Sequence, residues 1–219
     1  MSAAVSWSGG KESCLALHKV LQRGVKVSHL LTFVSNGRCI SHGLRSELIL
    51  AQSKAVDIPL IQKEVTWDTY GEGFREALDE LKKAGVDKLV LGDILEIPAH
   101  EGWVDNVCKE MNVQPIKPLW HLDPLKILNE FVARGFKAIV VKARANLLNE
   151  KWIGREVDQA FITEIGQLKN INPCGELGEY HTFVYDGPLF KKPIKIKGFE
   201  KRLIDNYWFL DISLFLFDK

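Results

Sequence analysis

A glycine-rich loop near the N-terminus is the first place where residue types and spacing could do chemistry. The segment Ser8–Ser13 reads SGGKES and lies between a short apolar run and a helical pattern. Glycines let a backbone turn sharply and approach a ligand closely. The first N–H groups of a helix are unpaired and lie at the positive end of its dipole. With the charge of Lys11 added, the loop predicts an anion site whose natural guest is a chain of phosphates.

Two common nucleotide-binding loops do not fit this segment. A Walker A loop needs glycine where Val5 stands, and it needs Ser or Thr directly after the lysine, where this chain has Glu12. The dinucleotide spacing GxGxxG is absent as well. A tight strand–helix turn with a solvated lysine is the plain structural alternative.

A second polar loop lies near the C-terminus and reads CGELGEYHTF over residues 174–183. Glu176 and Glu179 could orient an ammonium ion, bind a cationic substrate group or act as a base. His181 could pass a proton near neutral pH. The structural alternative is a hairpin whose glycines supply positive φ, whose acids are solvated, and whose histidine lies on a strand face.

The first loop resembles the SGGKDS signature of the PP-loop ATP pyrophosphatases, with Glu12 in place of the usual Asp. The resemblance implies cleavage of ATP between the α and β phosphates and adenylation of a substrate. It also implies an α/β fold of the adenine nucleotide alpha hydrolase type, with a five-stranded parallel sheet.

The second loop resembles the GE-x-GE-(Y/F)-x-T element of the diphthine–ammonia ligase family. The resemblance covers nearly the whole chain, and its further segments are Gly92-Asp93-Ile94, Pro118-Leu119-Trp120, Gly135-Phe136 with Val140-Val141, and Trp152-Ile153-Gly154-Arg155. It implies ATP-dependent amidation of a carboxyl group through an acyl adenylate, with release of AMP and pyrophosphate.

The resemblance also implies ligands and residue roles. The cofactors are ATP and Mg²⁺, and the substrates are ammonia and a carboxylate. The catalytic residues that it implies are Lys11, Glu176, Glu179 and His181. The residues that it implies for ATP binding are Ser8, Gly9, Gly10, Lys11, Glu12, Ser13, Gly92 and Asp93. The metal ion would be held by Glu12 and Asp93. The residues that it implies for contact with the acid substrate are Gly175, Gly178, Tyr180, Thr182, His100 and Glu101.

One stretch departs from the family pattern. Where typical members carry arginines after the fourth strand, residues 96–103 read EIPAHEGW. The acid therefore stays open between diphthine on an elongation factor and a corrinoid acid, the substrate of a related bacterial branch. Two other functions also stay open: RNA modification by a PP-loop enzyme, whose thiolating members add cysteine pairs, and nucleotide sensing without chemistry.

The elements that must position these loops alternate between strand and helix. Apolar runs at 3–7, 27–34, 59–61, 88–91 and 113–116 read as strands. The segments between them, at 14–22, 43–56, 72–84 and 102–111, have helical spacing. Such alternation predicts a parallel sheet covered by helices on both faces, with ligands bound beyond the carboxyl ends of the strands. Trp67 follows the third strand, where it could line the ligand pocket, and core packing is its expected role.

The pattern changes after Trp120. Helices are expected at 123–134 and 156–165, and strands at 138–141, 181–185, 195–199 and 207–217. We therefore expect an ATP-binding domain over residues 1–122 and a smaller substrate-binding α+β domain over residues 123–219. The apolar run Tyr207–Phe217 could complete a core strand or form an interface, which leaves a homodimer open.

Composition excludes several classes. The chain has 219 residues with 29 Lys plus Arg, 28 Asp plus Glu and a net charge of +1, so no nucleic-acid partner is expected. No apolar run approaches the roughly 20 residues of a membrane span, and the start lacks a secretory pattern. The four cysteines are scattered without a CxxC pair, which favours a reducing compartment. A cytoplasmic protein is the expectation.

Overall fold

The computed structural model describes residues 1–97 and 102–217. Its first sheet contains five parallel strands in the spatial order β4–β2–β1–β5–β6. Their bounds are β1 Ser2–Ser6, β2 Val27–Ser35, β4 Leu60–Glu64, β5 Val86–Val90 and β6 Gln114–Ile116. A two-residue strand, β3 (Arg38–Cys39), turns back antiparallel on the end of β2. The predicted five-stranded parallel sheet is confirmed, and only β3 is added.

Helices cover both faces of this sheet, because neighbouring residues of a strand point to opposite sides. Val5 of β1 packs in the cluster that contains α1 (Lys11–Gln22) and α2 (Ser46–Val56). Ala4 packs in the other cluster, with α3 (Tyr70–Lys83) and α4 (Trp103–Glu110). Both residues are fully buried. The sheet is therefore the middle layer of three, and the loops after its strands open at one edge.

The second part of the chain forms a four-stranded antiparallel sheet in the order β8–β7–β10–β9. The strands are β7 Lys137–Arg144, β8 Tyr180–Asp186, β9 Lys195–Ile204 and β10 Tyr207–Leu216. Helices α5 (Pro124–Ala133) and α6 (Gln159–Ile165) pack on each other, and a 3₁₀ turn, η2, spans Glu150–Trp152. Asp123 caps α5 by accepting a hydrogen bond from the backbone N–H of Lys126 at 2.9 Å.

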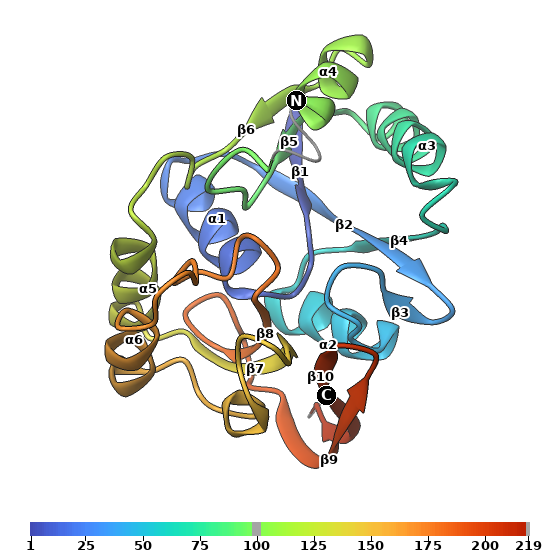
Figure 1. Ribbon diagram of the computed structural model, residues 1–219. Helices are drawn as coiled ribbons and strands as arrows, with labels where there is room; N and C mark the ends of the chain where they lie inside the picture. Colours follow the sequence, from blue (N-terminus) through green and yellow to red (C-terminus); the bar gives the residue numbers. More distant parts are fainter. Residues whose placement is uncertain (98–101, 218–219) are drawn as a thin grey trace.

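The two parts share one apolar core. The larger cluster joins α1 and α2 to buried residues of α5, β7, α6, β8 and β10. In Figure 1 this puts α1 between the first sheet and the α5–α6 pair, with β9 and β10 at the opposite end of the view from the N-terminus. The boundary near residue 122 stays a prediction, and the second part covers the α1–α2 side of the first.

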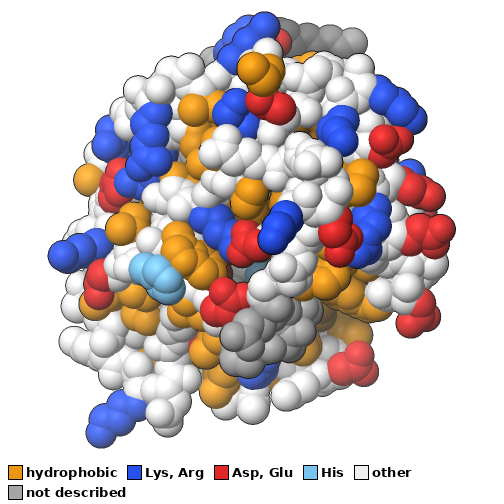
Figure 2. Space-filling model, turned by 90° about the horizontal axis from the view of Figure 1, so that it is seen from above, with side chains coloured by type: hydrophobic (Ala, Val, Ile, Leu, Met, Phe, Trp, Pro, Cys, Tyr) orange, Lys and Arg blue, Asp and Glu red, His pale blue; other side chains and the backbone are white. Residues whose placement is uncertain are grey.

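The surface agrees with the nearly neutral composition. Positive and negative side chains are interspersed with apolar ones over the face seen in Figure 2. In the described part of the chain, no helix is both long enough and apolar enough to cross a bilayer. The expectation for Trp67 was wrong, because this side chain is 69% exposed.

Candidate nucleotide and substrate site

The phosphate loop, defined as Ser8–Ser13, is held in place by residues far away in sequence. Gly9 has φ +77°, a conformation that favours glycine. Its carbonyl oxygen accepts hydrogen bonds from Gln52 Nε2 at 2.9 Å and from the backbone N–H of Val184 on β8 at 3.0 Å. A side chain at Gly9 would collide with the Gln52 amide. The loop is thus packed between α2 and the second sheet.

Gln52 binds two backbone carbonyl groups and the indole of Trp7 from a fully buried position on α2. Its Nε2 donates to Gly9 and to the carbonyl oxygen of Val184 at 2.6 Å. Its Oε1 accepts from Trp7 Nε1 at 3.0 Å. The sequence reasoning missed this residue. The only available signal was an amide on the otherwise apolar face of a predicted helix.

The serines of the phosphate loop support its turn. Gly92, in the loop after β5, allows that loop to approach the phosphate loop closely. Gly10 N donates to Ser8 Oγ at 3.3 Å, and Ser13 Oγ donates to the carbonyl of Gly10 at 3.0 Å. A Cβ on Gly92 would lie 3.0 Å from backbone atoms of Glu12 and Ser13. The absence of a side chain there brings the loop after β5 against the start of α1.

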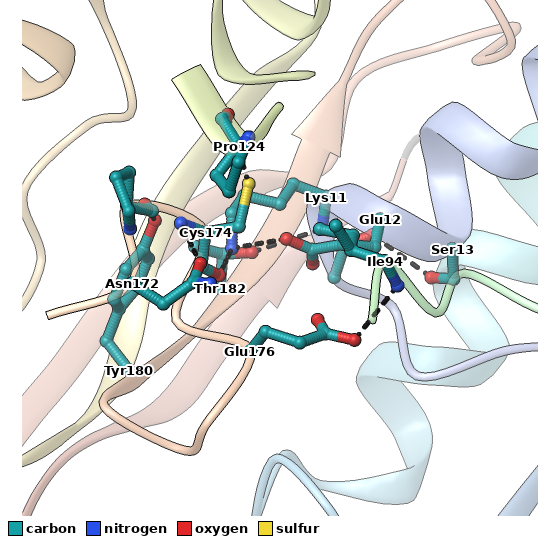
Figure 3. A network of polar contacts seen from close by, with 12 residues as sticks. Lys11, Glu12, Ser13, Ile94, Pro124, Asn172, Cys174, Glu176, Tyr180 and Thr182 are labelled. Carbon is teal, nitrogen blue, oxygen red and sulfur yellow. Dashed lines mark hydrogen bonds and ion pairs between the residues drawn. The ribbon is translucent and has the colours of Figure 1, made fainter. Parts of the chain in front are cut away.

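Lys11 is buried and turned toward the second loop, which we call the GE loop and define as Asn172–Glu179 (Figure 3). Its Nζ donates to the carbonyl oxygen of Cys174 at 2.7 Å and lies 2.7 Å from Glu12 Oε1. It also lies 4.4 Å from the centre of the Tyr180 ring, a cation–π distance. The expected phosphate lysine is therefore also a contact between the two loops.

The GE loop is closed by its own second glutamate. Glu179 is 2% exposed, and its carboxylate accepts from the backbone N–H of Asn172 at 2.7 Å and of Leu177 at 2.9 Å. Tyr180 is buried and donates its hydroxyl to the carbonyl of Pro173 at 2.6 Å. In this structure these groups hold the GE loop, and the catalytic role expected of Glu179 and the substrate contact expected of Tyr180 stay predictions.

Thr182 joins the two loops from β8. It is fully buried, and its Oγ1 accepts a hydrogen bond from the backbone N–H of Lys11 at 3.1 Å. Its position serves the phosphate loop instead of a second substrate. Gly175 and Gly178 have positive φ values of +72° and +83°, which form the turns of the GE loop as the hairpin interpretation expected.

Glu176 is the glutamate of the GE loop that reaches the first part of the chain. Its Oε1 accepts from the backbone N–H of Ile94 at 3.0 Å, just beyond Gly92-Asp93. Burial and the nearby carboxylates of Glu12 and Asp93 raise the pKa of Glu176 to about 7. Burial also raises the pKa of Asp93. Three carboxylates thus converge beside the start of α1.

Two histidines lie beneath the phosphate loop. The rings of His42 and His181 have centroids 4.6 Å apart, and His42 Nδ1 donates to the carbonyl of Thr182 at 3.2 Å. Burial and Lys11 lower the pKa of His42 to about 3. Burial, His42 and Lys142 hold the pKa of His181 well below its usual range. His181 is therefore neutral at pH 7 and a weak base, which does not fit the expected proton transfer near neutral pH.

A cavity of about 820 Å³ opens at the carboxyl edge of the parallel sheet. Ser8 of the phosphate loop and Asp93 after β5 line it, together with the ends of β1 and β2. Its wall also contains the aromatic side chains Phe33, Trp67, Tyr70, Trp103 and Trp120. A second cavity of about 450 Å³ shares Cys39, Ile40 and Trp67 with the first.

The structure brings most of the predicted site residues together and leaves two undescribed. Lys11, Glu12, Asp93, Glu176 and the two loops form one connected region. His100 and Glu101 lie outside the described residues. Cys14 is a buried thiol of the core, and Cys174 Sγ donates to the carbonyl of Pro124 at 3.3 Å. Burial and Glu12 raise the pKa of Cys174, so it is not an activated nucleophile.

Comparisons with known proteins agree with this arrangement of two parts. Residues 1–115 match the diphthamide synthase N-terminal domain, and residues 123–219 match the diphthamide synthase C-terminal domain. The diphthine–ammonia ligase of Mus musculus is 27% identical over 91% of this chain and 84% of its own length. The human protein is 28% identical with the same coverage. The Schizosaccharomyces pombe protein is 28% identical over 91% of this chain but 36% of its own length.

One solved structure is also similar, a predicted subunit of tRNA methyltransferase from Methanocaldococcus jannaschii. It matches with a TM-score of 0.46 and 19% identity over 88% of this chain and 99% of its own. A likeness this distant adds nothing about function. The two domain matches together cover nearly every residue from Met1 to Lys219, and the chain therefore belongs to the diphthamide synthase (diphthine–ammonia ligase) family.

Proposed function

We propose that this protein is a cytoplasmic ATP-dependent ligase that amidates a carboxylate with ammonia and releases AMP and pyrophosphate. The observation that carries the proposal is the direct contact between its two loops. Lys11 of the phosphate loop bonds to Cys174 of the GE loop, and Thr182 accepts from the Lys11 backbone. A phosphate-binding element and an acidic element are thereby joined in one site, as two successive chemical steps on one substrate require.

The larger cavity suits the nucleoside of ATP. Aromatic faces stack on purine rings, and the cavity begins at Ser8, where the phosphate loop starts. Its volume of about 820 Å³ is within the usual range for small-molecule sites. With adenosine against these rings, the phosphates extend toward the N-terminus of α1. There the free N–H groups and the helix dipole favour negative charge.

Lys11 supplies the mobile charge for the phosphates. In the structure Lys11 Nζ contacts the carbonyl oxygen of Cys174 and the carboxylate of Glu12. From this buried position the side chain can turn toward a phosphate oxygen. Stabilising charge as pyrophosphate leaves is the electrostatic form of catalysis, worth about 10²–10³-fold per well-placed donor. Glu12, which replaces the usual Asp, keeps the ammonium in place before ATP binds.

The carboxylates beside α1 fit a magnesium ion that arrives with the nucleotide. The carboxylates of Glu12 and Asp93 both raise the pKa of Glu176, so the space beside Glu176 favours a cation. The described residues contain no group of three protein ligands that could hold a metal alone. Mg²⁺ usually takes one or two carboxylates plus phosphate oxygens and water. Glu12 and Asp93 would hold it, and the ion would neutralise phosphate charge.

The GE loop serves the second half of the reaction. Glu176 lies between the loop after β5 and the phosphate loop, where its carboxylate can orient an ammonium ion next to the activated acid. A pKa near 7 lets this group accept a proton as ammonium becomes ammonia. Glu179 and Tyr180 keep the loop closed around it.

The acid is the diphthine side chain of an elongation factor, or else a corrinoid acid. The names of the similar proteins favour the first. RNA thiolation is disfavoured because the four cysteines are all buried and unpaired. A nucleotide sensor without chemistry is disfavoured by the intact lysine and by Glu176, which binding alone would not need.

The test is to follow α-labelled ATP with Mg²⁺ and ammonium, with diphthine-bearing elongation factor or a corrinoid carboxylate added separately. AMP that appears with one acid supports the ligase and identifies its substrate. ADP as the product would contradict cleavage between the α and β phosphates. ATP binding without AMP under either condition would contradict both substrates.

A further inference from the structure

The second cavity, about 450 Å³, has walls from both parts of the chain. Arg38, His42 and Trp67 come from the first part, and Lys142, Arg202 and Phe209 come from the second. The cavity shares Cys39, Ile40 and Trp67 with the space that suits adenosine, so the two cavities are neighbours. Apart from Trp67, none of the residues proposed above for ATP or ammonium lines it.

The charges around this cavity are unbalanced. Arg38, Lys142 and Arg202 line it, and Asp211 is the only carboxylate among the lining residues. Asp211 already accepts from Arg38 at 3.0 Å and from two nitrogens of Arg45 at 3.0 and 2.9 Å. The carboxylate is therefore satisfied without Lys142. Arg202 is also paired, with Glu200 at 2.7 Å, so the surplus positive charge of the cavity lies at Lys142.

Lys142 has no acidic partner. Its Nζ donates to the carbonyl oxygen of Ser41 at 3.3 Å and lies over the rings of Tyr207 and Phe209 at 4.8 and 5.4 Å. None of the ion pairs within residues 1–97 and 102–217 involves it. Burial lowers the pKa of Lys142, since a cation without a counter-ion is costly away from water. An anion in the cavity would supply that counter-ion.

The cavity also lies against the phosphate loop. His42 lines it, and a Cβ on Gly10 would meet His42 Cε1 at 2.5 Å. His42 therefore lines this cavity and also packs against the backbone of the phosphate loop at Gly10. The apolar part of the wall, with Phe209, Ile204 and Val141, suits the hydrocarbon part of a side chain or small molecule.

We propose that this second cavity binds the acid substrate of the ligase, with the Lys142 ammonium paired to its carboxylate. This inference rests on the proposed function for the identity of the anion. It also explains release of the product. Adenylation already converts the carboxylate into a mixed anhydride, and the amide that ammonia then forms is neutral, so the product has no ion pair with Lys142 to hold it in the cavity.

The first experiment needs no turnover. Pyridoxal 5′-phosphate is an anionic aldehyde that condenses with a neutral amine, losing water, and borohydride then reduces the imine to a stable mark. We expect Lys142 to be labelled at least tenfold faster than Lys137, a 60%-exposed lysine on the same strand. Glutarate should slow the labelling of Lys142 at constant ionic strength and leave Lys137 unaffected. Equal labelling rates, or protection by inorganic phosphate alone, would overturn the inference.

The second experiment uses the reaction. Lys142→Met keeps the apolar stem of the side chain, and Lys137→Met is its matched control. We expect the KM for the acid to rise at least tenfold in Lys142→Met, with the KM for ATP unchanged and with no change in Lys137→Met. An equal rise in both KM values would overturn the inference. If neither acid supports AMP release, the proposed function fails, and the labelling experiment still decides whether the cavity binds a carboxylate.

Discussion

The ammonium nitrogen of Lys11 lies 2.7 Å from the carbonyl oxygen of Cys174, 163 residues further along the chain. The contact is fully internal, because Lys11 is 2% exposed and Cys174 is also 2% exposed. A lysine is rarely buried without a charged partner, and Glu12 supplies one here. The position of Lys11 in the phosphate loop therefore depends on the conformation of the GE loop.

Replacing Lys11 tests its role with the phosphates. We expect Lys11→Met to reduce AMP release about 10²–10³-fold, since one electrostatic donor at the leaving group is lost. Lys83→Met, on the exposed surface of α3, is the control and should keep full activity. The measurement is AMP released per minute from labelled ATP. Activity within about threefold of the parent would remove Lys11 from the mechanism.

The first glutamate of the GE loop should act in chemistry. Glu176→Gln keeps the acceptor for the Ile94 N–H but loses the charge that orients ammonium. We expect the rate of amide formation to fall about 10²-fold or more, as for loss of a general base. ATP binding, measured by calorimetry, should stay within about twofold. A parallel loss of ATP affinity would indicate that Glu176 holds the loops together instead.

The second glutamate should act in stability. The two carboxylate oxygens of Glu179 accept hydrogen bonds from the backbone N–H groups of Asn172 and Leu177. Glu179→Gln replaces one of these oxygens with an NH₂ group, so one N–H loses its acceptor. We expect a loss of about 1–3 kcal/mol in the free energy of unfolding, since a buried donor is left unsatisfied. For a chain of this size each kcal/mol lowers Tm by about 2–4 °C. An unchanged melting temperature would contradict the structural role of Glu179.

Gln52 should control nucleotide affinity from beneath the phosphate loop. Gln52→Leu is close in size and removes the hydrogen bonds to Trp7, Gly9 and Val184. We expect a loss of about 1–3 kcal/mol in stability and a higher KM for ATP. The control is Gln62→Leu, whose hydrogen bond to Ser46 is exposed. If both variants have the parent KM for ATP, the loop does not depend on Gln52.

Acid should weaken the link between β10 and the first part of the chain. Arg45 and Arg38 lower the pKa of Asp211 to about 2, below its ordinary value of 3.8. The folded state thus favours the ionised carboxylate. Its stabilisation is complete above the unfolded pKa and is lost as the pH falls toward 2, by about 2 kcal/mol in all. Urea unfolding between pH 6 and pH 2.5 measures it.

Asp211→Asn is the matched control for this pH dependence. The variant should start less stable at pH 6 and lose less stability on acidification than the parent, because the titrating group is gone. Equal slopes in the two proteins would show that other carboxylates cause the acid sensitivity.

The order of elements was predictable because each one has a strong local signal. The strand Ser2–Ser6, the glycines after it and the helix from Lys11 follow from apolar periodicity and from turn residues. The strand β3 was missed, because two residues are too few to show a period. Trp67 was assigned to the core from its size, but its position after a strand places it at the cavity.

The residues that form the site could be predicted from the sequence, but most of their hydrogen-bond partners could not. Lys11 and Glu176 stand in motifs, so their region could be inferred from the sequence. The roles of Glu179, Tyr180 and Thr182 depend on which backbone groups they meet, and these come from other loops and strands. Lys142 and Asp211 lie in ordinary strand sequence. The pairing of β7 with β10 brings them together, and residues from the first part of the chain complete the cavity.

The contact between β8 and the phosphate loop has a consequence for how the protein is made. Lys11 leaves the ribosome 171 residues before Thr182, which with Val184 holds the phosphate loop in place. A nascent chain therefore carries the lysine and glycines long before their backbone has these partners. The phosphate loop can take its final geometry only after β8 has been synthesised.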